Sequence, residues 1–150
     1  MRQKFPPDGA GVRPAALILV LPDRTKIDTM RGWMIERFKP IPLVFWKSAA
    51  GREPVRDWLN ELPREDQRII GRDIAKVQFG WPIGLPVCRP LGNGLWEVRS
   101  SLPSRREGRV LFGFHDGMLI ALNAFIKKTQ ATPAGEITLA QHRSKEAIAP

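Results

Sequence analysis

The chain has 150 residues, enough for one domain that buries roughly two-thirds of the surface of its extended chain. Its hydrophobic content of 43% and charged content of 26% describe an ordinary soluble globular protein, and its net charge of +9 favours a polyanionic partner such as nucleic acid, the ribosome or an acidic protein. A generic basic surface is the alternative. The single cysteine, Cys88, excludes an internal disulfide, fits a reducing cytosol and is expected to be buried. Two histidines and one cysteine, widely separated, exclude a recognisable zinc site.

Residues 1–40 differ from the rest of the sequence. They contain a short apolar run, Ala15–Leu21, whose seven residues are too few to span a membrane. The rest of this segment has no clear period, so we expect 1–40 to be a weakly ordered N-terminal extension and 41–150 to form the domain. The extension is either a dispensable segment or the result of a translation start that truly lies at Met30 or Met34.

Regular structure is expected to begin with a strand at 41–46 and to continue with two helices. Pro54 suits the first position of a helix, because a missing N–H is not needed there. Pro63 ends that helix and opens the next, which Gly80 closes. Because the helices are joined around one proline, the pattern predicts an αα-hairpin. The first helix has an apolar stripe at Val55, Trp58, Leu59 and Leu62, and the second has one at Ile70, Ile74 and Val77.

Three strand-like runs follow and form the centre of the chain. Leu95–Ser100 and Arg109–Phe114 alternate, so that Arg99 and Arg109 each lie opposite the apolar face of their strand. Met118–Ile126 is apolar apart from one asparagine, as expected of a central strand buried on both faces. Asp116-Gly117 separates the last two runs and predicts a hairpin, because both residues tolerate positive φ. The runs therefore predict an antiparallel meander.

Shorter elements flank this meander. Val87–Arg89 is expected to form a short strand and Pro90–Gly94 a loop. Thr132 is expected to cap a final helix that starts at Pro133 and runs to about Ala147. The predicted order is β-α-α-β-β-β-β-α, an α+β fold.

The basic residues of the meander are the best candidates for chemistry. The sequence has no Gly-x-Ser-x-Gly motif, no P-loop and no metal signature. An arginine fork binds two phosphate oxygens, and a fixed cation stabilises the extra negative charge of a pentacoordinate phosphorane. RNA supplies its own nucleophile, the 2′-hydroxyl, and a desolvated lysine is able to act as base. The candidates are Arg99, Arg105, Arg106, Arg109, Lys127 and Lys128.

The same basic residues also fit roles without catalysis. Arg99 is equally able to pair with Glu97 or Glu107 in a surface ladder, which would contribute under ~1 kcal/mol. Simple binding of phosphate or of an acidic partner also fits. His115 precedes the predicted turn and is expected to be a solvated turn residue. Trp81 is able to stack on a base, whereas Trp96 is expected in the core.

Five motifs occur in one order along the chain, namely Glu53–Leu59, Val77–Pro82, Leu95–Arg99, Arg109–Phe112 and Ala124–Pro133. Together they resemble the phage-related HigB/RelE-type toxins, and the likeness covers about residues 41 to 145. It implies the RelE/ParE fold, an αα-hairpin packed on a small, mainly antiparallel sheet with a C-terminal helix. It also implies the toxin of a type II toxin–antitoxin system that cleaves mRNA on the ribosome without a metal or other cofactor.

The resemblance also implies roles for individual residues. Arg99 and Arg109 would clamp the scissile phosphate, and Lys127 or Lys128 would activate the 2′-hydroxyl or bind the backbone. Further RNA contacts are expected from Arg89, Arg105, Arg106 and Trp81. Several relatives add a C-terminal tyrosine or histidine as an acid or stacking group, but this chain has no tyrosine and no clear equivalent. The identity of the acid and base therefore stays open.

The expected partners are an antitoxin (a small helix-turn-helix protein), the ribosome and mRNA, in the cytoplasm and away from membranes. Two other functional classes stay open. One is a ParE-like gyrase poison that is not an enzyme, and the other is a non-catalytic binding remnant of a prophage.

Overall fold

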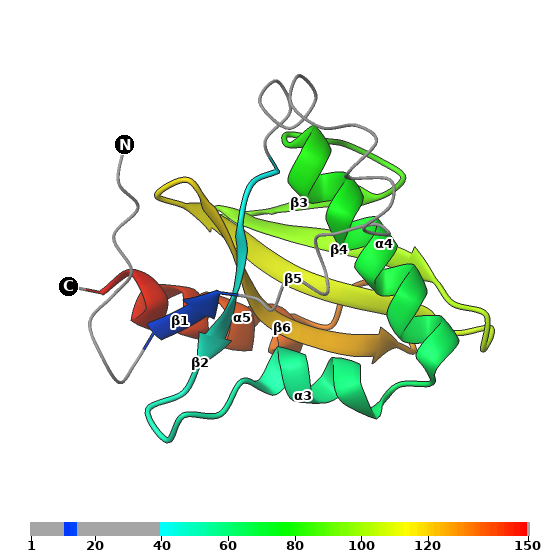
Figure 1. The fold of residues 1–150 in the computed structure, drawn as a ribbon, viewed down its shortest axis with the longest axis horizontal. Coiled ribbons are helices and arrows are strands. Elements are labelled where there is room, and N and C mark those ends of the chain that lie inside the picture. The colour runs from blue at the N-terminus through cyan, green and yellow to red at the C-terminus, as the bar shows by residue number, and fades with distance from the viewer. Residues whose placement is uncertain (1–10, 15–39, 150) are drawn as a thin grey trace, which may run out of the picture.

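The computed structural model describes residues 11–14 and 40–149, which form a mostly antiparallel sheet with helices on both faces (Figure 1). The sheet has six strands in the order β1-β2-β6-β5-β4-β3, and only the pair β2–β6 is parallel in this part of the chain. The predicted α+β class, αα-hairpin and C-terminal helix are confirmed. The elements are β1 (Gly11–Pro14), β2 (Leu43–Lys47), α3 (Pro54–Glu61), α4 (Arg64–Gly80), β3 (Cys88–Gly92), β4 (Leu95–Ser101), β5 (Glu107–His115), β6 (Met118–Lys127) and α5 (Ala134–Ile148).

Strand β1 precedes residue 41, where we expected regular structure to begin. Its four residues pair antiparallel with β2, Gly11 opposite Lys47, and extend the edge of the sheet. The expectation was therefore wrong for 11–14. The apolar run Ala15–Leu21 and the two candidate start codons, Met30 and Met34, lie outside the described residues. The boundary at residue 41 stays a prediction.

Helices α3 and α4 cover one face of the sheet. They begin and end where the prolines and the glycine predicted, with Pro54 as the first residue of α3 and Gly80 as the last of α4. The stripe of α4 packs on the apolar sides of β4 and β5. Members of this core are Val55, Leu59, Ile70, Ile74, Val77, Val98, Val110 and Phe112, each at most 6% exposed.

Helix α5 covers the opposite face, behind the strands in Figure 1. It packs through the small residues Ala140 and Ala147, which allow the helix to approach the sheet closely. Arg143 fastens it further, because its guanidinium donates to the carbonyl oxygen of Leu122 at 2.8 Å and lies 4.7 Å from the centre of the Trp46 ring. Burial lowers the pKa of Arg143, while the charges of two glutamates on α5 oppose this shift.

Two local predictions differ from the structure. Pro90–Gly94 was expected to be a loop, but β3 continues to Gly92, across a bulge, and only Asn93 and Gly94 make the turn, both with positive φ. Thr132 was expected to cap α5, but Pro133 holds the N-cap position and the Thr132 hydroxyl donates to Glu97. The hydroxyl therefore joins the end of the sheet rather than the helix.

Candidate nucleic-acid interface

Three rows of side chains cross the sheet face that α5 partly covers. Residues directly opposite each other in neighbouring strands point to the same face. Phe125 and Leu111 belong to the core beneath α5, so their rows lie on that face. The rows are Arg89–Glu97–Leu111–Asn123, then Arg99–Arg109–Phe125, then Ser101–Glu107–Lys127.

Helix α5 covers only part of this face. It starts at the first row, where the Asn123 side-chain amide donates to the backbone oxygen of Glu136 at 3.1 Å. It then runs toward the β5–β6 hairpin, since its Ser144 lies beside Gly113. The helix therefore runs away from the third row and from the two arginines of the second row, while Phe125 of the second row still packs in the core beneath α5. We call the basic residues at this end of the sheet, namely Arg89, Arg99, Lys127 and Lys128, the cationic surface.

Arg109 lies beneath this surface rather than on it. Its side chain is only 2% exposed, and its Nε lies 3.5 Å from Oε1 of Glu97. One terminal nitrogen lies 3.3 Å from the Glu107 carboxylate and donates to the carbonyl oxygen of Gly108 at 2.8 Å. A buried charge requires such partners. This burial differs from the expected phosphate clamp, because the guanidinium has almost no surface on which RNA could bind.

Glu97 is the residue that the sequence prediction missed. It is 1% exposed and lies between the two arginines, with Oε1 3.9 Å from Nε of Arg99 and 3.5 Å from Nε of Arg109. Its other oxygen accepts the hydrogen bond of Thr132. The alternation of β4 correctly places Glu97 and Arg99 on one face of the sheet. It did not reveal the role of Glu97, because charged residues that alternate in a strand are typically exposed, whereas Glu97 is buried.

Arg99 is partly exposed, although its Nε atom is buried. Its side chain is 33% exposed, and its backbone N–H donates to the Val87 carbonyl oxygen at 2.8 Å, which holds the strand in place. Within the described part of the chain, Glu97 is the one ionic partner of its side chain. Of the two predicted clamp residues, Arg99 therefore has the geometry for contact with an anion.

The remaining members of the cationic surface lie around Arg99. Arg89 is exposed on β3 opposite Glu97, and half-buried Lys127 ends β6 opposite Glu107. Lys128 is the next residue and is exposed. The fold thus brings Arg89, Arg99 and Lys127 from three strands to one face.

Arg105 and Arg106 lie in the turn between β4 and β5, at the end of the third row. Arg105 is exposed with a φ of 62°. Arg106 is held from the α4 side, because its guanidinium lies 3.3 Å from the Asp66 carboxylate. Ser104 also donates to Asp66, from its hydroxyl at 2.7 Å, and this hydrogen bond is the main cause that lowers the pKa of Asp66. The structure therefore brings neither arginine onto the sheet face itself.

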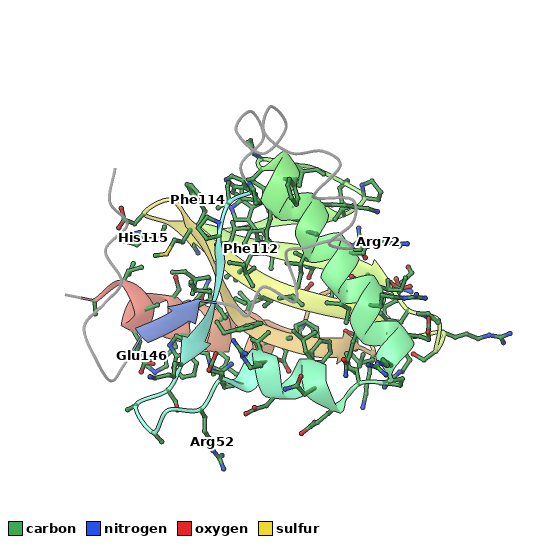
Figure 2. The ribbon with its side chains drawn as sticks, in the orientation of Figure 1. Arg52, Arg72, Phe112, Phe114, His115 and Glu146 are labelled. Carbon is green, nitrogen blue, oxygen red and sulfur yellow. The ribbon has the colours of Figure 1, made fainter. Side chains whose placement is uncertain are left out.

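Trp81 and both histidines lie away from the cationic surface. Trp81 packs on the α4 side of the sheet, with its ring centre 4.9 Å from that of Trp96, which belongs to that core. His115 stands at the hairpin end of β5, six residues from Arg109 and hence roughly 20 Å away along the strand. Figure 2 shows it at that end. His142 is 69% exposed on α5 and pairs with Glu146 at 3.1 Å.

A known protein family matches the part of the chain that builds this surface. The sequence model of the phage-derived Gp49-like family (DUF891) matches residues 57–145. The chain belongs to the Gp49-like family. This family is related to the RelE/HigB-type toxins, and the matched segment contains every residue of the cationic surface. No curated protein matches the chain at a significant level.

Two further observations concern residues 11–14 and 40–149 of this Gp49-like protein. None of their helices is both long enough and apolar enough to cross a membrane. Nor do they gather three histidine, cysteine, aspartate or glutamate side chains in a group that would hold a metal ion.

Proposed function

We propose that the protein is the toxin of a type II toxin–antitoxin system and cleaves mRNA on the ribosome. The observation that carries this proposal is the cationic surface, in which partly exposed Arg99 lies beside the buried ion pair of Glu97 and Arg109. Membership in a family related to RelE/HigB-type toxins supports it.

The chemistry needs no protein nucleophile. The 2′-oxygen of the RNA attacks the neighbouring phosphorus and loses its proton. The bond from phosphorus to the 5′-oxygen then breaks, and the 5′-oxygen gains a proton. Arg99 stabilises the negative charge that builds up on the phosphoryl oxygens, which is worth about 3 kcal/mol for one well-placed donor. Lys127 or Lys128 accepts the 2′-hydroxyl proton as the neutral amine, or binds the flanking backbone as the ammonium. The proton donor is unassigned.

The proposed partners follow from the net charge of the protein and from its proposed class, a type II toxin. A net charge of +9 favours binding to the RNA-rich ribosome, where the codon is presented as single-stranded RNA. An antitoxin, expected to be a short helix-turn-helix protein, would silence the toxin. A neighbouring reading frame of that kind would support this assignment.

Induced expression followed by primer extension tests the proposal. We expect growth arrest and new mRNA 5′ ends within translated codons, and both are expected to disappear in Arg99→Ala. Intact mRNA with supercoiling defects would instead identify a ParE-like gyrase poison. Unchanged growth would identify a non-catalytic remnant. Undiminished cleavage by Arg99→Ala would overturn the assigned site.

A further inference from the structure

Arg99 and Arg109 form an unfavourable pair by position alone. They are directly opposite each other in the antiparallel ladder of β4 and β5. Side chains in such positions have Cβ atoms roughly 4.5–5.5 Å apart, and like charges placed there destabilise a sheet. A negative charge near both guanidinium groups is therefore needed to offset their repulsion.

Glu97 lies where it compensates this repulsion. Its Oε1 is within 3.9 Å of the Nε atoms of both arginines, and its carboxylate is 1% exposed, so solvent screens the attraction weakly. Neither Nε atom makes a hydrogen bond, although both are buried. The negative charge of Glu97 therefore orients the arginines, rather than a directional hydrogen bond. A glutamine of the same shape would lack that charge.

The second carboxylate oxygen of Glu97 extends this effect to the loop after β6. It accepts the hydrogen bond of the Thr132 hydroxyl, which fixes the segment between Lys128 and α5. One buried carboxylate thus contacts β5, its own strand and the loop that carries Lys128. Arg109 has a second counter-ion in Glu107, whereas Arg99 has none among the described residues. The positive charge of Arg99 is therefore balanced by fewer carboxylates than that of Arg109, and more of it acts on a bound phosphate.

We propose that Glu97 is the positioning residue of the RNA-cleavage site, which sets the direction of the Arg99 guanidinium and ties the Thr132 loop to it. This inference rests on the proposed function. Glu97 itself does not touch RNA, because it is buried. Its replacement is expected to affect the reaction through Arg99, and to lower kcat more than it raises KM.

A double-mutant cycle in a reconstituted translation reaction tests this proposal. Glu97→Gln is expected to lower kcat about 100-fold, the loss typical of a reacting group displaced by 1 Å, with KM changed by less than about threefold. In an Arg99→Ala background the same substitution is expected to have almost no further effect, since the residue that Glu97 orients is already absent. A purely structural role would instead give the same loss in both backgrounds. Independent effects of that kind would overturn the proposal.

Thr132 supplies variants that keep the buried charges intact. Thr132→Val removes only the hydroxyl and is expected to lower kcat about tenfold, because the loop is then no longer fixed to Glu97. Thr132→Ser retains the hydroxyl and is expected to restore the rate. Equal rates for Thr132→Val and the wild type would contradict the loop part of the proposal, even if Glu97→Gln failed to fold.

NMR of the arginine side chains separates a failure of this inference from a failure of the proposed function. In the wild type the Arg99 Nε–H is buried and is expected to exchange slowly with water, and in Glu97→Gln it is expected to exchange quickly. If the wild-type protein cleaves no RNA, the proposed function fails, and the exchange rates still decide whether Glu97 orients Arg99. Unchanged exchange in Glu97→Gln would overturn the positioning role.

Discussion

Arg99 and Arg109 have the same side chain and lie opposite each other, yet burial gives them different roles. Arg109 is 2% exposed between two carboxylates, whereas Arg99 is 33% exposed with one ionic partner among the described residues. The alternation of the strands correctly predicts that both lie on one face. It cannot predict their depth, because burial depends on contacts between segments far apart in the chain, such as the hydrogen bond from Thr132 to Glu97. The sequence therefore predicted two arginines that bind the phosphate, whereas the structure has partly exposed Arg99 beside buried Arg109.

Stability measurements are expected to separate the two arginines. Arg109→Ala removes the closer guanidinium partner of the buried Glu97 carboxylate, and it is expected to lower the free energy of unfolding by about 3–5 kcal/mol. Arg99→Ala removes a partly exposed ion pair and is expected to cost under about 1 kcal/mol. Urea unfolding followed by tryptophan fluorescence measures both changes. Similar losses in the two variants would contradict the assigned difference in burial.

The buried thiol of Cys88 gives a second expectation for a single residue. Burial raises the pKa of Cys88 to about 11, and the nearby charge of Glu97 acts in the same direction. At pH 8 only roughly one thiol in a thousand is then ionised, and the thiolate is the reactive form. We expect no reaction with a disulfide reagent at pH 8 in the native protein and one full equivalent in urea. Fast labelling of the native protein would show that the site is open.

At the scale of elements, local signals predicted most of the fold. Prolines and glycines predicted the limits of α3 and α4, and alternation predicted β4 and β5, because these signals act within a few residues. Strand β1 escaped prediction, since its four residues gain their structure from pairing with β2, which lies far along the chain, Gly11 opposite Lys47. The Thr132 contact with Glu97 escaped for the same reason, because it joins residues 35 positions apart.

The contact between α4 and the β4–β5 turn is expected to depend on pH. Asp66, near the start of α4, accepts hydrogen bonds from Ser104 and Arg106 of that turn, chiefly the Ser104 hydroxyl, which lowers its pKa below the ordinary value of 3.8. Because the folded pKa is the lower one, ionised Asp66 stabilises the fold above pH 3.8. This contribution is lost as pH falls through the folded pKa.

Asp66→Asn tests this dependence. The variant is expected to be less stable than the wild type at pH 7, and the difference is expected to shrink as the pH drops below 3.8. Urea unfolding of both proteins at pH 7, 5 and 3 measures it. A difference that stayed constant over this range would mean that the Asp66 charge does not hold the turn.

At the scale of the whole molecule, a net charge of +9 does not by itself define an interface. Basic residues also lie on other faces. Arg72 projects from α4 and Arg52 from the loop before α3 (Figure 2), and neither segment contributes to the cationic surface. The fold concentrates part of this charge in one place, because Arg89 of β3, Arg99 of β4 and Lys127 of β6 lie on the same face of the sheet. A polyanion bound at this surface should therefore respond to substitutions there and not elsewhere.

The salt dependence of RNA binding tests that localisation. A single-stranded 2′-O-methyl RNA cannot be cleaved through its 2′-oxygen, so its affinity can be measured at equilibrium. Contact with the four cations Arg89, Arg99, Lys127 and Lys128 predicts a slope of log K against log salt of about −3, at roughly −0.7 for each phosphate contact on a single strand. Lys128→Ala is expected to reduce the magnitude of this slope by about 0.7. Arg52→Ala removes one exposed charge of the same sign and is expected to leave the slope unchanged. Equal slopes for the two variants would mean that RNA binds through the net charge of the molecule and not through the cationic surface.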